Sequence, residues 1–206
     1  MKKKNKAIYL LFLMPFVYFA TACFVMWLVK TSGIYPSGSD TMYHVYRGDY
    51  VYNAIKSGKL YPLYDPAWYN GVEILRYWSP LPAYVMAFCQ YLAGGSQFGA
   101  YLFYIWGVCF LGACVWPFIG RGFNRPYLGA FIGLLWFFMP NNLCAIFIEG
   151  NLARSLSMIF LPVFIYAVYK YLYNQKLRYI PLMAFTFLLM ALCHLGYAGM
   201  EAISVI

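Results

Sequence analysis

Charged side chains are scarce in this sequence. Only 10% of its 206 residues are charged, with six acids and fifteen lysines and arginines, whereas 64% are hydrophobic. This composition leaves no room for a soluble domain of ordinary size beside the apolar segments. The two histidines are too few for a three-histidine zinc site. The six cysteines fall in apolar segments and form no Cys-x-x-Cys pair, which predicts small buried side chains rather than disulfides or metal ligands.

Long apolar runs indicate a membrane protein. Runs close to the roughly 20 residues that a spanning helix needs predict spans at about 7–29, 98–119, 127–148, 156–173 and 179–200. The stretch 79–93 is shorter and predicts an interfacial helix. The first run is too long for a signal peptide, so we expect an uncleaved anchor. The expected fold is all-α: one polytopic transmembrane domain that stops inside an apolar run, as the N-terminal part of a longer chain.

The net charge of +9 comes largely from basic residues that gather between the spans. They lie before the first span, between the second and third, and after the fourth: Lys2, Lys3, Lys4, Lys6, Arg121, Arg125, Lys170, Lys176 and Arg178. Such clusters mark the cytoplasmic side. They predict a multi-pass protein of the cell membrane with a cytoplasmic N-terminus, rather than nucleic-acid binding. The segments 35–78 and 149–154 then share the outer side, unless 79–93 crosses the membrane and moves the arginines 121 and 125 outside.

The outer segment 35–78 differs from the rest of the chain. It holds four of the six acids, nine tyrosines and two tryptophans, but no phenylalanine. Tyrosine and tryptophan combine an apolar face with a polar edge, which suits an aqueous site at a membrane boundary. We therefore expect this loop to bind a ligand.

The start of this loop contains the principal candidate for chemistry. Ser37 to Asp40 form a helix-start signal before a predicted helix at 41–56. Asp40, His44 and Arg47 fall at i, i+4 and i+7, on one helix face. Asp40 is the candidate general base for an attacking hydroxyl, with a metal ligand as the variant. The alternative is a carboxylate that caps the helix, and the two roles can coexist. His44 is a candidate to orient Asp40 or to bind substrate, or else a polar residue on a wet helix face.

A second polar cluster lies between two predicted spans, at Glu149 to Arg154 (EGNLAR). Charges at a membrane edge are costly and usually functional, which makes Glu149, Asn151 and Arg154 candidate site residues. The structural alternative is a Glu149–Arg154 pair that stabilises the turn, with Asn151 capping the next helix. In the outer loop, Arg47 and Arg76 are candidates for holding phosphate, because guanidinium offers forked donors. Ordinary loop charge is the alternative for both.

The layout resembles the GT-C superfamily of polytopic membrane glycosyltransferases. The resemblance rests on the first span, the acid early in the outer loop, and the stretch 79–84 (SPLPAY) leading into a short apolar helix. The segments 38–44 (GSDTMYH) and 149–154 are also similar to bacterial membrane proteins called "6-pyruvoyl-tetrahydropterin synthase-related" and, more loosely, to YfhO-type membrane proteins. By position, the resemblance implies that Asp40 is the catalytic base and Glu149 a second catalytic acid. Ser39 and Thr41 flank Asp40 in place of a second acid, so the sequence assigns no definite cofactor and leaves a divalent metal as the alternative.

The function implied by this resemblance is sugar transfer in the cell envelope. A polyprenyl-phosphate-linked sugar would be the donor, and a saccharide, a lipid or a protein on the outer side would be the acceptor. Arg154, together with Arg76 or Arg47, would neutralise the donor phosphate. The rival hypothesis is a membrane transporter or a non-catalytic assembly or scaffold protein, which would use the same charges for binding or gating.

Overall fold

The computed structural model describes residues 2–36 and 38–205. Ser37, part of the predicted helix start, lies outside the described residues, as do the side chains of the lysines at 2, 3, 4 and 6. The described residues form helices and no strand. In chain order the α-helices are α1 (Lys2–Ser32), α2 (Thr41–Lys56), α3 (Leu81–Leu92), α4 (Gln97–Gly122), α5 (Pro126–Leu135), α6 (Pro140–Leu143), α7 (Leu152–Asn174), α8 (Ile180–Cys193) and α9 (Leu195–Val205).

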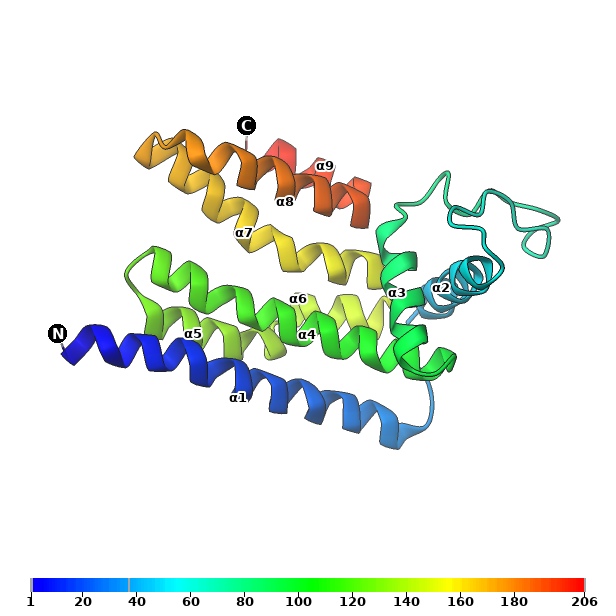
Figure 1. The fold of residues 1–206 in the computed structure, drawn as a ribbon, viewed down its shortest axis with the longest axis horizontal. Helices are drawn as coiled ribbons and strands as arrows, with labels where there is room; N and C mark the ends of the chain where they lie inside the picture. The colour runs from blue at the N-terminus through cyan, green and yellow to red at the C-terminus, as the bar shows by residue number, and fades with distance from the viewer. Residues whose placement is uncertain (1, 37, 206) are drawn as a thin grey trace.

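The long helices run side by side as a bundle (Figure 1). Four helical segments are long and apolar enough to cross a membrane: Phe12–Ser32, Gln97–Gly122, Pro126–Ile148 and Leu152–Asn174. The predicted class, a polytopic α-helical membrane protein, is therefore confirmed.

Small residues allow α4 and α5 to pack closely. A Cβ on Gly120 would lie only 2.6 Å from the Cα of Gly129, so the two backbones touch. On the neighbouring helix α1, the Tyr18 hydroxyl donates a buried hydrogen bond of 2.8 Å to the Ala130 carbonyl. Such contacts hold helices together where lipid supplies no hydrophobic driving force.

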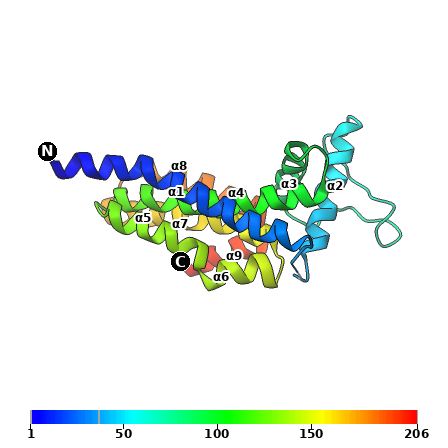
Figure 2. The same cartoon turned by 90° about the horizontal axis from the view of Figure 1, so that it is seen from below.

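The basic clusters lie at one end of the bundle. The start of α1, the α4–α5 turn and the α7–α8 turn all lie at this end (Figure 1). Helices α2 and α3 and the loop 57–80 form the opposite end, and α2 stands across the bundle axis (Figure 2). The segment 35–78 and the turn at Glu149 thus share one end of the molecule, as the charge pattern predicted.

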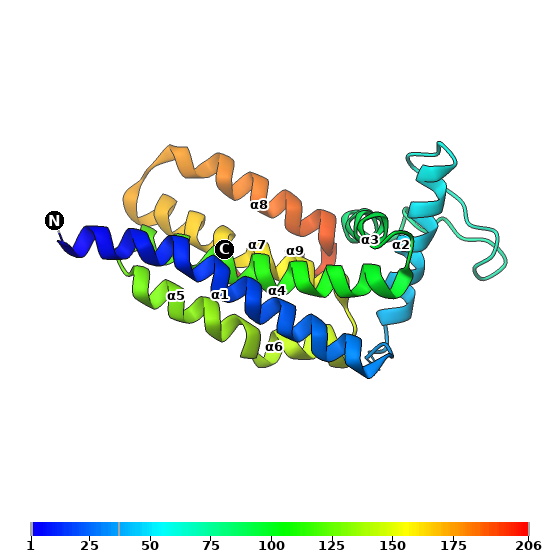
Figure 3. The same cartoon turned by 60° about the horizontal axis from the view of Figure 1, so that its bottom comes forward.

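The short apolar helix α3 lies across the long helices rather than alongside them (Figure 3). It contains 12 residues. At about 1.5 Å per residue it spans roughly 18 Å, well short of a hydrocarbon core of about 30 Å. This geometry favours the interfacial helix expected at 79–93 over the alternative in which this stretch crosses the membrane.

Two of the expected spans are interrupted. The segment 127–148 is helical throughout most of its length but changes type, from α5 through a 3₁₀ turn (Trp136–Phe138) and α6 to a π-helical turn (Cys144–Ile148). The run expected at 179–200 is divided by His194, whose backbone is extended (φ −156°, ψ 95°). A 3₁₀ turn, Leu177–Tyr179, precedes α8. The first interruption coincides with Pro140, Asn141 and Asn142, and the second with His194, so polar or helix-breaking residues mark both within the apolar runs.

Candidate functional site

The two polar clusters predicted from the sequence meet directly, although they lie 110 residues apart. The Asp40 backbone N–H donates to the Glu149 carbonyl at 3.0 Å, and the Ser39 hydroxyl donates to the same carbonyl at 3.0 Å. Glycines make this approach possible, because a Cβ on Gly38 would lie 2.5 Å from the Cα of Gly150. Asp40 thus lies in direct contact with the second cluster.

The Asp40 carboxylate does not cap α2. Its side chain accepts no hydrogen bond from the first N–H groups of the helix. The Ser39 hydroxyl, at 3.3 Å, is its partner among the described residues, and Asp40 is exposed. The capping alternative therefore does not describe this side chain, which lines a cavity instead.

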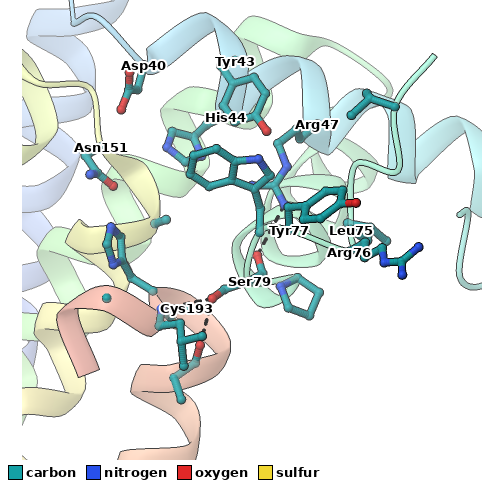
Figure 4. A pocket seen from close by; sticks show the side chains of 18 of the residues that line it. Asp40, Tyr43, His44, Arg47, Leu75, Arg76, Tyr77, Ser79, Asn151 and Cys193 are labelled. Atoms are coloured by element: carbon teal, nitrogen blue, oxygen red, sulfur yellow. Dashed lines mark hydrogen bonds between the residues drawn. The ribbon is translucent and has the colours of Figure 1, made fainter. Parts of the chain in front are cut away.

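This cavity has a volume of about 930 Å³. Helix α2 and the loop 57–80 form one wall, and the start of α7 together with the α8–α9 junction forms the other. Asp40 and Asn151 lie toward one end, Arg76 and Tyr77 toward the other, with His44 between (Figure 4). Five of the seven predicted site residues thus share one cavity: Asp40, His44, Arg47, Arg76 and Asn151.

Arg47 is a buried cation that lines this cavity without an acidic partner among the described residues. Its side chain is 1% exposed. One terminal nitrogen makes long contacts of 3.4 and 3.5 Å to the carbonyls of Ile74 and Ser79, while its Nε has no partner in the described part of the chain. Its guanidinium lies 5.4 Å from the ring centre of Tyr43 and 5.9 Å from that of Trp78. A buried charge of this kind is costly unless an anion compensates it.

His44 is held neutral by its surroundings. Burial, together with the smaller effects of Arg47 and His194 nearby, lowers its pKa from the ordinary 6.5 to about 3. An imidazole with this pKa carries no charge at neutral pH. His44 can therefore donate or accept a hydrogen bond in the cavity without adding to its positive charge.

Glu149 and Arg154 pair beside the cavity rather than within its lining. One terminal nitrogen of Arg154 donates to both Glu149 carboxylate oxygens, at 2.8 and 2.9 Å. The other donates to the Asn141 side-chain oxygen at 2.6 Å. The Asn151 side-chain oxygen accepts the Arg154 backbone N–H at 3.0 Å and so caps α7. The structural alternative considered for this turn is therefore present, although Asn151 also lines the cavity.

Arg76 marks the open edge of the cavity. It pairs with Glu73 at 2.6 Å, and its side chain is 65% exposed. An exposed pair of this kind contributes little to stability. Arg76 is thus a rim residue that already has a partner, unlike Arg47.

Ser79 and His194 also shape the cavity but were not among the predicted site residues. The Ser79 hydroxyl donates to the Ala191 carbonyl at 2.9 Å and accepts the Leu195 N–H at 3.2 Å. The His194 Nδ1 accepts the Tyr197 N–H at 3.0 Å, which caps α9. A polar residue inside an apolar run, such as His194, is the one sequence signal that pointed here. The serine carried no such signal.

No metal centre can be assigned from the described residues. No three His, Cys, Asp or Glu side chains come together among them as metal ligands would. Asp40 in particular has no second acid as a neighbour in the cavity lining.

Comparison with known proteins gives one match. Residues 75–206 match the model of a family described as the 6-pyruvoyl-tetrahydropterin synthase related domain, a membrane protein. The match covers more than half of the chain, from the end of the outer loop through α3 to α9, and leaves Asp40, His44 and Arg47 outside it. No curated protein matches the chain. No solved structure matches it.

Proposed function

This chain belongs to the 6-pyruvoyl-tetrahydropterin synthase related family of membrane proteins, and from that premise we propose that it is a membrane glycosyltransferase. It transfers a sugar from a polyprenyl-phosphate-linked donor to an acceptor on the outer side of the membrane, with the N-terminus in the cytoplasm. The family description itself names no such activity, so the proposal rests on the cavity.

The observation that carries the proposal is the pair of opposite charges in one cavity. Asp40 presents a carboxylate and Arg47 a buried guanidinium, and neither has an ion-pair partner among the described residues. A purely structural pair would have joined these charges to each other or to neighbours. Because the two groups are separate and unpaired, Asp40 is free to accept a proton and Arg47 is free to bind an anion.

The proposed chemistry uses both charges. Asp40 accepts the proton of an acceptor hydroxyl. The hydroxyl oxygen forms a bond to the anomeric carbon of the donor sugar while the bond from that carbon to the phosphate oxygen breaks. The departing lipid phosphate gains negative charge, which Arg47 stabilises from its buried position. Neutral His44 adds a hydrogen bond without repelling Arg47.

The cavity walls suit a donor that lies in the membrane. One wall belongs to the polar outer loop, and the other to the junction of the apolar helices α8 and α9. Leu195 at this junction is 70% exposed and lines the cavity. A lipid alongside α8 can therefore bring its phosphate to Arg47. Arg154 is less suited to this task than the sequence implied, because Glu149 and Asn141 already occupy both of its terminal nitrogens.

Replacing Asp40→Asn tests the proposal. Asparagine retains the shape but cannot take a proton, so we expect sugar transfer to fall by about 10²–10⁴-fold. Transfer from polyprenyl-phosphate-linked sugars is measured in membranes at matched expression. Asp49→Asn is the matched control: Asp49 lies on the same helix but outside the cavity, and an amide oxygen can still accept the 2.6 Å hydrogen bond from Gln90. Near-parental transfer by the Asp40 variant would remove Asp40 as the base.

A transporter is the second candidate, and one observation favours it. The segment 126–148 passes through 3₁₀ and π-helical turns, and α8 breaks before α9. Transporters build substrate sites from such interrupted helices. Uptake of radiolabelled lipid-free sugar phosphate into proteoliposomes, combined with no transfer from any donor tested, would establish this function instead.

A further inference from the structure

Five aromatic residues surround the cavity on its outer side. We call them the aromatic rim: Tyr43, Trp68, Tyr69, Tyr77 and Trp78, all of which line the cavity. Tyr69 is 86% exposed, Tyr77 71% and Trp78 54%. Tyr43 lies at the centre, with its ring centre 5.1 Å from that of Trp68 and 5.6 Å from that of Trp78, both edge to face. Large aromatic rings left this open beside a cavity are available to a ligand.

Two members of the rim, Trp68 and Tyr69, are held in place by a small hairpin within the loop 57–80. Asp65 and Val72 exchange two backbone hydrogen bonds of 2.9 Å. The buried Asp65 carboxylate also accepts the Ala67 N–H at 2.9 Å and the hydroxyl of Tyr46. The hairpin therefore presents its tip, which carries Trp68 and Tyr69, as a preformed surface rather than a loose loop.

Tyr69 occupies an unfavourable backbone conformation. Its backbone is left-handed, with φ +48°, which a bulky side chain rarely adopts. Asn70 and Gly71 follow with φ +63° and +112°, residue types that accept such angles readily. A glycine at 69 would suit this turn better than tyrosine. Strain of this kind, on a ring that is almost fully exposed beside a cavity, points to a functional role for the side chain.

We propose that the aromatic rim binds a saccharide chain and that this chain is the acceptor of the reaction; the second part rests on the proposed function. Sugar rings carry apolar C–H faces that stack on aromatic rings, and their hydroxyls suit the polar edges of tyrosine and tryptophan. The charged side chain nearest the open edge, Arg76, is already neutralised by Glu73. The five rim side chains are themselves uncharged and aromatic, which matches a neutral sugar chain.

The other acceptor classes fit less well. Peptides are recognised through an open strand edge or through charged pockets. The hairpin pairs only at Asp65 and Val72, so it provides no open strand edge of useful length. A lipid acceptor would have to approach from the bundle, whereas the loop 57–80 projects beyond the bundle end on the side away from the N-terminus (Figures 1 and 2).

Binding to purified protein tests this inference without any donor. The probes are cellohexaose, maltohexaose and chitohexaose, with a neutral Gly-Ser peptide of similar length as the comparison, and tryptophan fluorescence reports binding. We expect at least one hexasaccharide to bind and the peptide not to bind. Tyr69→Gly should weaken saccharide binding about tenfold, the loss of one stacking contact, and leave thermal stability equal or higher. Tyr61→Ala is the control: Tyr61 lies in the same loop, 53% exposed and outside the cavity lining, and its loss should leave binding unchanged.

The outcomes separate this inference from the proposed function. Failure of all three hexasaccharides to bind, or equal binding by the peptide, would overturn the saccharide site, even if sugar transfer to another acceptor were observed. A binding loss in Tyr61→Ala equal to that in Tyr69→Gly would also overturn it. Saccharide binding that responds to Tyr69→Gly in a protein without transferase activity would sustain the rim and reject the enzyme.

Discussion

His44 illustrates how neighbouring residues set the chemistry of a single side chain. From the sequence it is one polar residue on a helix. In the folded protein it is buried beside Arg47 and near His194, and its pKa falls to about 3. The same burial leaves Arg47 without a compensating anion. One cation and one neutral imidazole together form a site that an incoming phosphate would complete.

The low pKa of His44 predicts how stability depends on pH. The unfolded chain accepts a proton near pH 6.5 and the folded chain does not until about 3, so this group reduces stability as the pH falls between these values and has no effect above them. The free energy of unfolding should fall as the pH is lowered from 7 to about 4.5. We expect this fall to be smaller in His44→Gln than in the parent by roughly 2 kcal/mol. Thermal unfolding in detergent, followed by tryptophan fluorescence, measures it. Parallel pH curves for the parent and the variant would contradict the low pKa.

One serine joins the start of α3 to the distant junction between α8 and α9. Ser79 precedes α3, yet its hydroxyl contacts the last turn of α8 and the first residue of α9. Where α8 stops, the N–H groups that begin α9 need partners. Ser79 and the His194 ring supply two of them. The α8–α9 junction, which lines the cavity, is thus stabilised in part by Ser79, a residue that belongs to neither helix.

Removing this hydroxyl should loosen the junction. We expect Ser79→Ala to lower the free energy of unfolding by about 1 kcal/mol and to speed hydrogen exchange at Leu195, whose N–H loses its acceptor. Exchange measured by mass spectrometry over residues 191–197 checks this. Ser57→Ala is the control, because the Ser57 hydroxyl makes only a local hydrogen bond to Ala54. Exchange at 191–197 that is unchanged in the Ser79 variant would show that the junction holds without the serine.

The whole molecule is polar at both ends, in different ways. One end carries the arginines and lysines of the turns between helices, and the other carries the cavity and most of the acids. Because α3 lies across the end of the bundle, the chain remains at this end until α4 begins (Figure 3). The cavity and the aromatic rim therefore lie together at one end of the bundle.

Cysteine labelling tests this orientation. A membrane-impermeant maleimide should label Ser57→Cys on intact cells and Asn174→Cys only after permeabilisation, because the positive turns stay in the cytoplasm. Both positions are exposed. Ser57 follows α2 and Asn174 ends α7, and these helix ends lie at opposite ends of the bundle (Figure 1). The parent protein, labelled in the same way, gives the background labelling of the native cysteines. Labelling of Asn174→Cys alone on intact cells would reverse the topology and place the cavity in the cytoplasm.

The sequence by itself determined the class of protein and many of its helical segments. Of the five spans predicted from apolar runs, four correspond to described helical segments long and apolar enough to cross a membrane, and local helix signals predicted α2 at 41–56 to the residue. The charge pattern also predicted that the loops carrying Asp40 and Glu149 lie on the same side. These features follow from composition, length and spacing, which are local properties of the chain.

Only the tertiary structure decided what each polar side chain does. Arg154 and Arg47 look alike in the sequence, but a contact with Glu149 neutralises the first, and burial leaves the second open to an anion. His194 was visible in the sequence as a polar residue inside an apolar run, but the hydroxyl that stabilises the break comes from Ser79, 116 residues away from the Leu195 N–H it accepts. Burial and long-range hydrogen bonds depend on which segments pack together, and no local pattern contains that information.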